Sequence, residues 1–430
     1  MERKKQLILI SIGIILYFFA NFQRVAIPGA IFDLLQRDLN ASAPYITALG
    51  SVFMYIYAIC QLIVGVMIDR YGGNRVIAFG AAFFCLGSLM FPLCSNLFLI
   101  YFSRTLVGLG ASTVYLSLIK EIKQTFSSAN FGLILSIALL VGYMGGIFAN
   151  APFVFFVNKL GWRESLFLTA LFTTVVSIVF LTIYKLSKRR KINKEVKLNL
   201  KPFKKVLKNK KNRNLYSFAV LNYGMYYVLQ TVIGMKFLQD FCLISVEKSA
   251  LILSSMAALY AVGGSFLAFL SKMFYTRKAV FLRIISCSTL AIFSLISIMI
   301  FLDIKETLFM ALLLFVLAGS ASLSPLLVPL LHETNDKKVS STAVSIMTSL
   351  FSLCVGLLGN ITGIIMNLYP AEVLENGTYR YSNNSYLLIF SFFVVLSVIS
   401  LINVLKLQDS QKTKRLISFK DASLHIHIGW

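Results

Sequence analysis

The stretch GVMIDRYGGNRV, residues 65–76, is a short charged segment between two apolar runs, 45–68 and 76–93. Each run is close to the roughly 20 residues that a membrane-spanning helix needs. Backbone groups in lipid must be hydrogen-bonded within the segment itself, so these runs are predicted to be helices. Ten further runs recur along the chain, at 7–34, 97–119, 131–157, 166–184, 216–238, 251–270, 280–302, 308–331, 339–368 and 386–405.

Composition supports a membrane protein. Hydrophobic residues make up 58% of the 430 residues, about 249 in all, and twelve spans would use about 240. A water-soluble protein has no means of hiding that much apolar surface. The net charge of +24 is spread over segments between the apolar runs. We therefore attribute it to the membrane rather than to nucleic acid.

A basic segment divides the chain at its midpoint. Residues 185–213, KLSKRRKINKEVKLNLKPFKKVLKNKKNR, hold 14 Lys/Arg and one acid, Glu195. We predict a six-helix bundle at 1–184, a linker at 185–213 that lies near anionic lipid head groups, a second six-helix bundle at 214–406, and a tail at 407–430.

The basic residues also indicate orientation. With the N-terminus inside, the inner segments carry 32 of the 41 Lys/Arg and the outer loops carry 6. Lys and Arg are retained on the cytoplasmic side, so both termini are predicted to be cytoplasmic. The Lys-, Ile- and Asn-rich composition points to a bacterial inner membrane. Three basic residues, Arg24, Arg104 and Lys236, and one acid, Asp33, remain inside the membrane.

The charged segment at 65–76 resembles the signature of the major facilitator superfamily, G-x-x-x-D-R-x-G-x-x-R, in the loop between its second and third helices. The resemblance implies twelve helices in two six-helix halves that rock about a central site. It also implies that this loop latches the halves on the cytoplasmic face. Gly65 would allow close helix contact, and Asp69 would face a helix N-terminus. The predicted latch residues are Gly65, Asp69, Arg70, Gly72, Arg75 and, as an ionic partner, Glu121.

Two other segments are similar to family patterns. RTLVGLGAS holds Arg104, Gly108 and Gly110, for which we predict a structural role in tight helix packing. A weaker copy of the loop signature in the second half lacks the acid and consists of Ser271, Lys272, Arg277 and Lys278.

Ionisable groups deep in a bilayer are costly and usually functional. Arg24 shares a helix face with Asn21 and is the best candidate to bind an anion, since the first and seventh helices line the cavity in this family. The alternative is that Arg24 pairs with Asp33 or with backbone carbonyls.

The seventh run carries a polar-aromatic stripe, which is either a cavity wall or helix packing. Its members are Asn222, Tyr223, Tyr226, Tyr227 and Gln230. Gly224 and Gly234 would loosen this helix, and Lys236 would reach the interface. Further candidates to bind the solute are Tyr57, Gln61 and Tyr143, and less strongly Asn150, Asn360 and Thr362.

The predicted function is secondary transport of a small polar solute, favoured if anionic, coupled to a proton or a counter-anion, by a monomer. One alternative is an efflux permease for an apolar compound, and another is a membrane sensor or enzyme. The three histidines lie near or beyond helix ends, and no catalytic motif is present. We therefore expect no metal, no cofactor, no enzymatic activity and no nucleic-acid partner.

Overall fold

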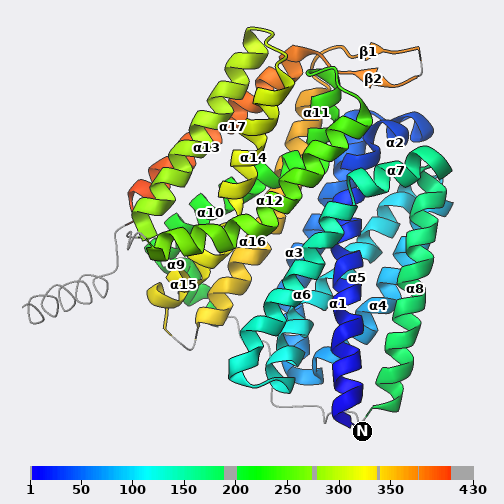
Figure 1. The fold of residues 1–430 in the computed structure, drawn as a ribbon, viewed down its shortest axis with the longest axis vertical. Coiled ribbons are helices and arrows are strands. Elements are labelled where there is room, and N and C mark those ends of the chain that lie inside the picture. The colour runs from blue at the N-terminus through cyan, green and yellow to red at the C-terminus, as the bar shows by residue number, and fades with distance from the viewer. Residues whose placement is uncertain (1, 188–200, 274–277, 337–338, 376, 408–430) are drawn as a thin grey trace, which may run out of the picture.

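The computed structural model describes residues 2–187, 201–273, 278–336, 339–375 and 377–407 (Figure 1). Residues 188–200 of the predicted linker, nearly all of the predicted tail, and Arg277 lie outside these ranges. The described chain is helical apart from loops and one short hairpin, in which β1 (Glu372–Val373) pairs antiparallel with β2 (Tyr379–Arg380).

The first half supplies six membrane passes. Two are interrupted: the first by Pro28, which lacks the N–H that a helix interior needs, and the fifth at Asn150. The elements are α1 (Glu2–Ala26), η1 (Gly29–Ile31), α2 (Phe32–Leu39), α3 (Ala43–Tyr71), α4 (Gly73–Leu93), α5 (Leu97–Thr125), α6 (Ser128–Phe148), α7 (Ala151–Leu160) and α8 (Trp162–Leu186).

The second half follows a short helix, α9 (Lys201–Lys208). Its seventh pass is built from three pieces, α10 (Lys210–Val228), the π-helical turn η2 (Leu229–Ile233) and α11 (Gly234–Asp240). The remaining helices are α12 (Val246–Met273), α13 (Lys278–Phe301), α14 (Thr307–Ala321), α15 (Ser324–Thr334), α16 (Ser340–Met366) and α17 (Asn383–Leu405).

Eleven helical stretches of the described chain are long and apolar enough to cross a membrane. The α10–η2–α11 segment stands in the place of the twelfth, and its polar side chains explain why it falls below the hydropathy of the others. The predicted fold class, an all-α membrane protein with twelve spans in two halves, is confirmed.

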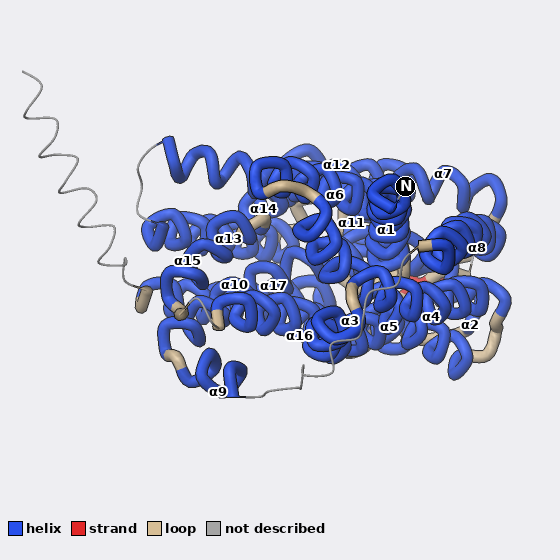
Figure 2. The backbone as a smooth tube through the Cα atoms, turned by 90° about the horizontal axis from the view of Figure 1, so that it is seen from below, coloured by secondary structure: helices blue, strands red, loops and turns tan. Residues whose placement is uncertain are grey.

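The two ends of the bundle carry different elements (Figure 1). We call the end with β1, β2, η1 and α2 the hairpin end, and the end with α9 and the N-terminus the linker end. Seen from below, the two halves lie beside each other, with α16 next to α3 and α12 next to α6 (Figure 2).

The halves approach most closely near the hairpin end. A Cβ on Gly363 of α16 would lie 2.0 Å from Thr47 Oγ1 of α3, and one on Gly356 would lie 2.6 Å from the Tyr55 ring. The halves are therefore in close contact at the hairpin end. At the linker end, no atom lies within 4 Å of a Cβ built on Gly65.

Candidate functional site

A cavity of about 130 Å³ lies between the halves, and nineteen residues line it. Nine of the ten side chains predicted to bind the solute are among them: Asn21, Arg24, Tyr57, Gln61, Tyr143, Tyr223, Tyr226, Tyr227 and Gln230. The lining also contains residues that were not predicted from the sequence, chiefly Tyr17, Tyr115, Tyr260, Thr348, Phe351 and Ser352.

Arg24 alone is charged among the nineteen lining residues. Its guanidinium lies 4.5 Å from the ring centre of Tyr227 and 5.5 Å from that of Tyr57. Its Nη2 donates to the Tyr223 hydroxyl at 2.9 Å, while its buried Nε has no hydrogen-bond partner. The rings cover the faces of the guanidinium and leave part of its edge for an oxyanion.

The alternative partner for Arg24 is excluded by geometry. Asp33 lies on α2 and pairs with Lys236 Nζ at 2.9 Å. No carboxylate or backbone carbonyl of the described residues is bonded to Arg24. The cavity therefore carries a positive charge that no described side chain neutralises.

The cavity wall is rich in hydroxyl groups. Eight of its residues are tyrosines, four from each half. Tyr226 stacks on Tyr260 with ring centres 4.9 Å apart, and Tyr143 meets Tyr260 across the two halves at 5.9 Å. Such a wall offers both ring faces and hydrogen-bond donors to a solute.

Gln230 faces the cavity from the second half, at the π-helical turn η2. Its Nε2 donates to Leu253 O at 3.0 Å, and its buried Oε1 has no partner. A Cβ on Gly234 would lie 2.1 Å from Leu229 O, so glycine is required for this turn. π-Turns of this kind are frequent at functional sites.

Four other candidates lie outside the cavity lining. Asn222 donates to Ser400 Oγ at 2.6 Å within the second half. Asn150 donates to Gly146 O at the α6–α7 break, and Thr362 to Gly359 O. Asn360 donates to the Tyr55 hydroxyl at 2.9 Å and so joins the two halves.

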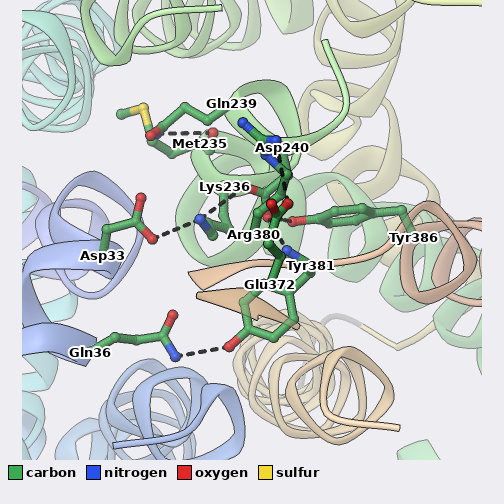
Figure 3. A network of polar contacts seen from close by, with 10 residues as sticks. All are labelled: Asp33, Gln36, Met235, Lys236, Gln239, Asp240, Glu372, Arg380, Tyr381 and Tyr386. Atoms are coloured by element: carbon green, nitrogen blue, oxygen red, sulfur yellow. Dashed lines mark hydrogen bonds and ion pairs between the residues drawn. The ribbon is translucent and has the colours of Figure 1, made fainter. Parts of the chain in front are cut away.

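A buried ion network crosses the halves at the hairpin end (Figure 3). Lys236 Nζ lies 2.9 Å from Asp33 of the first half and 2.9 Å from Asp240 of the second. Asp240 also accepts from the Tyr386 hydroxyl at 2.7 Å and from the Tyr381 backbone N–H at 3.0 Å. The expectation that Lys236 reaches the interface is wrong, because its side chain is only 2% exposed. The two carboxylates make that burial possible.

A second contact reinforces this network. Gln36 of α2 donates to the Tyr381 hydroxyl at 2.8 Å, again from the first half to the second (Figure 3). Burial raises the pKa of Tyr381 to about 12, so this hydroxyl keeps its proton at physiological pH.

The predicted latch residues lie together at the linker end. Asp69 forms an ion pair with Lys120 of α5. Glu121 accepts from the backbone N–H of Gly73 at 2.9 Å and of Asn74 at 3.3 Å, so Glu121, rather than Asp69, faces the N-terminus of α4. Gly72 joins α3 and α4 with φ 86°, a backbone conformation that favours glycine.

The other latch residues make contacts within the first half. Arg75 Nε donates to the Tyr184 hydroxyl at 3.2 Å, and the Arg70 guanidinium lies over the Tyr71 ring. Gly65 faces open space, unlike the close helix contact expected of it. That contact would require the halves to approach each other at the linker end.

Arg104 lies in the core of the first half with an exposed fraction of 0%. Its guanidinium donates to three backbone carbonyls, Leu49 O at 3.2 Å, Gln23 O at 3.1 Å and Ile27 O at 3.3 Å. It therefore connects α1, α3 and α5 and takes no part in lining the cavity. In the same helix, a Cβ on Gly110 would lie 2.6 Å from Gly80 O, and one on Gly108 would lie 2.9 Å from Phe53 O.

We expect Arg104→Ala to lower the free energy of unfolding by about 3 kcal/mol, because three buried carbonyls lose charged donors. Thermal unfolding of the purified protein in detergent should show a melting temperature several degrees lower. Arg380→Ala is the matched control, since Arg380 is exposed and pairs with Glu372 at 3.5 Å. Equal melting temperatures for Arg104→Ala and Arg380→Ala would contradict the structural role.

The family model of the Major Facilitator Superfamily matches residues 13–359, and the chain belongs to that family. The fold agrees with a solved bacterial homologue of the human lysosomal transporter Spinster in an inward-facing, unoccupied conformation. The TM-score is 0.73 at 15% identity, covering 93% of this chain and 97% of that one. The chain is therefore a multi-pass membrane protein of this superfamily.

Curated relatives match only in part. An uncharacterised transporter, YybO, of Bacillus subtilis is 24% identical over 41% of each chain. A chloroplastic ascorbate transporter of Arabidopsis thaliana is 22% identical over 34% of this chain and 27% of its own length. A probable sulfoacetate transporter, SauU, of Cupriavidus necator is 20% identical over 38% of this chain and 37% of its own. The chain thus spans less than half the length of these relatives.

Proposed function

We propose that this transporter carries a small organic anion, which binds at Arg24 in the cavity between the halves. The observation that carries the proposal is the unneutralised guanidinium of Arg24, held between Tyr57 and Tyr227 with part of its edge free. The cavity has a volume of about 130 Å³. An engineered cavity of about 150 Å³ in another protein binds benzene, so we expect a solute of about that size.

The named relatives support an anionic solute. Two of them are named for ascorbate and sulfoacetate. A third relative, 35% identical over 72 residues, is a probable anion transporter of Arabidopsis thaliana. The alternative of an apolar permease would require Arg24 to be paired off by a carboxylate, and Asp33 instead pairs with Lys236. As in the prediction from the sequence, we propose that movement of the solute is coupled to movement of a proton or a counter-anion.

The proposed mechanism is alternating access by rocking of the two halves. In this structure the hairpin end is held closed by Asp33, Lys236 and Asp240, while Gly65 at the linker end faces open space. The opposite state would separate Asp33 from Lys236 and bring the Gly65 region against the second half. The latch residues would then act at the linker end, as the family resemblance implies.

We place the linker end in the cytoplasm of a bacterial cell, with the basic linker against anionic lipid head groups and the protein as a monomer. Single cysteines at Lys123 and Lys305 of a cysteine-free variant test the orientation, since both side chains are exposed at opposite ends. A membrane-impermeant maleimide added to intact cells should label position 305 and spare position 123. The reverse pattern would contradict the orientation.

A thermal-shift screen tests the anion proposal. Purified protein is heated with a panel of small carboxylates and sulfonates, each beside its uncharged amide. An anion at about 100 times its Kd stabilises the protein by about 2.7 kcal/mol. We expect stabilisation by members of the anionic set and none by the amides. Stabilisation by the amides alone would contradict the proposal.

A further inference from the structure

The cavity offers a second polar atom in need of a partner, and it lies on the half opposite Arg24. Gln230 is 3% exposed. The orientation of its amide follows from chemistry, because Leu253 O only accepts and so must face the Nε2 of Gln230, at 3.0 Å. Its Oε1 is then the free atom, buried and without a hydrogen-bond partner.

The two unpartnered atoms are complementary in kind. Arg24 Nε is a charged donor that lacks an acceptor, and Gln230 Oε1 is a neutral acceptor that lacks a donor. Both residues line the same cavity. Buried polar groups are normally hydrogen-bonded, and one without a partner in the protein calls for an occupant that supplies it.

We propose that the solute is an organic anion that also carries a neutral hydrogen-bond donor, a hydroxyl or an amide N–H. Its anionic group binds Arg24, and its donor binds Gln230 Oε1. The contact between the anionic group and Arg24 rests on the proposed function, and the contact between the donor and Gln230 rests on Gln230 alone.

This arrangement gives the donor a role in the transport cycle. Arg24 belongs to α1 of the first half, and Gln230 belongs to η2 of the second. A solute that makes both contacts joins the halves, whereas an anion without a donor lacks the contact with Gln230. A ligand shifts a conformational equilibrium only by its difference in affinity for the states, so the donor favours the state in which the halves close around the solute.

Matched pairs of anions test the proposal by binding to the purified wild-type protein. 3-Hydroxypropionate is compared with propionate, and 2-hydroxyethanesulfonate with ethanesulfonate, so that charge and carbon number stay constant and one hydroxyl is added within each pair. We expect the hydroxylated member to bind about fivefold to tenfold more tightly, the effect of one neutral hydrogen bond. Equal affinity within both pairs, including no measurable binding by either member, overturns the Gln230 subsite.

Variants separate this inference from the anion site itself. Gln230→Leu should remove the preference for the hydroxylated member while propionate keeps its affinity. Gln239→Leu is the matched control, because that amide donates to Met235 O away from the cavity, and it should retain the preference. Arg24→Ala should weaken all four anions. A preference that survives in Gln230→Leu overturns the inference, whereas binding that survives in Arg24→Ala overturns the proposed function instead. If Gln230→Leu does not fold, the wild-type pairs still decide.

Discussion

Arg24→Ala is expected to weaken binding of the anionic solute by at least about 100-fold and to abolish its uptake into proteoliposomes. A hydrogen bond to a charged group contributes about 1.5–3 kcal/mol, and an oxyanion on the guanidinium edge would make two. Their loss corresponds to more than two orders of magnitude in Kd. Isothermal titration with the best anion of the panel measures the change.

Two further variants show whether the loss is specific. Arg24→Lys keeps the positive charge but loses the planar fork, so its affinity should lie between wild type and Arg24→Ala. Arg37→Ala removes an exposed arginine of α2 that pairs with Asp38 at 3.5 Å, and it should bind as wild type. Wild-type affinity in folded Arg24→Ala would contradict the anion site.

Lys236→Met is expected to open the hairpin end. The substitution leaves the buried Asp240 and the half-buried Asp33 without their shared cation. Removing one partner of a buried ion pair costs about 3 kcal/mol or more, which corresponds to more than about 100-fold in a conformational equilibrium. The change acts on the closed hairpin end, since Asp33 would reach water when the halves separate there.

Spin labels on cysteines at Tyr45 and Leu302 measure this opening, because both side chains are exposed and lie on different halves. Double electron–electron resonance should show a longer distance population in Lys236→Met than in wild type. Asp33→Asn should have a smaller effect, since Lys236 keeps Asp240. Lys305→Met, which removes an exposed pair with Asp303 within one half, should have none. An unchanged distance distribution in folded Lys236→Met would contradict the proposal that Lys236 holds the hairpin end closed.

The fold could be predicted from the sequence because lipid requires long apolar helices, and their spacing is visible in the chain. Breaks inside passes were harder to predict. The seventh pass divides at the π-turn of residues 229–233, and the fifth divides at Asn150. Both breaks depend on how neighbouring helices pack, and a single apolar run does not record that packing.

The candidate site was partly predictable for the same reason. Arg24 stands out as a charge within an apolar run, and its spacing from Asn21 and its place on the first helix favoured the cavity. Tyr17 lies four residues before Asn21 on α1, so the same spacing would have identified it. Tyr115 and Tyr260 gave no such signal, because an isolated tyrosine in a membrane helix is equally compatible with packing.

The partner of Asp33 was not predictable. Arg24 is nearer in the sequence, but Lys236 of the other half is its ion-pair partner. Asp240, which completes the network, lies just beyond the predicted seventh run, so the apolar runs do not mark it as a residue inside the membrane. Pairings between the halves depend on tertiary contacts that the sequence alone does not show.

An experimental structure of the protein with the tightest-binding anion of the panel would show directly whether Arg24 holds the solute. We predict the anionic group in contact with the guanidinium edge of Arg24, between the rings of Tyr57 and Tyr227. A bound anion that lies elsewhere, with Arg24 still without an acceptor, would contradict the anion site.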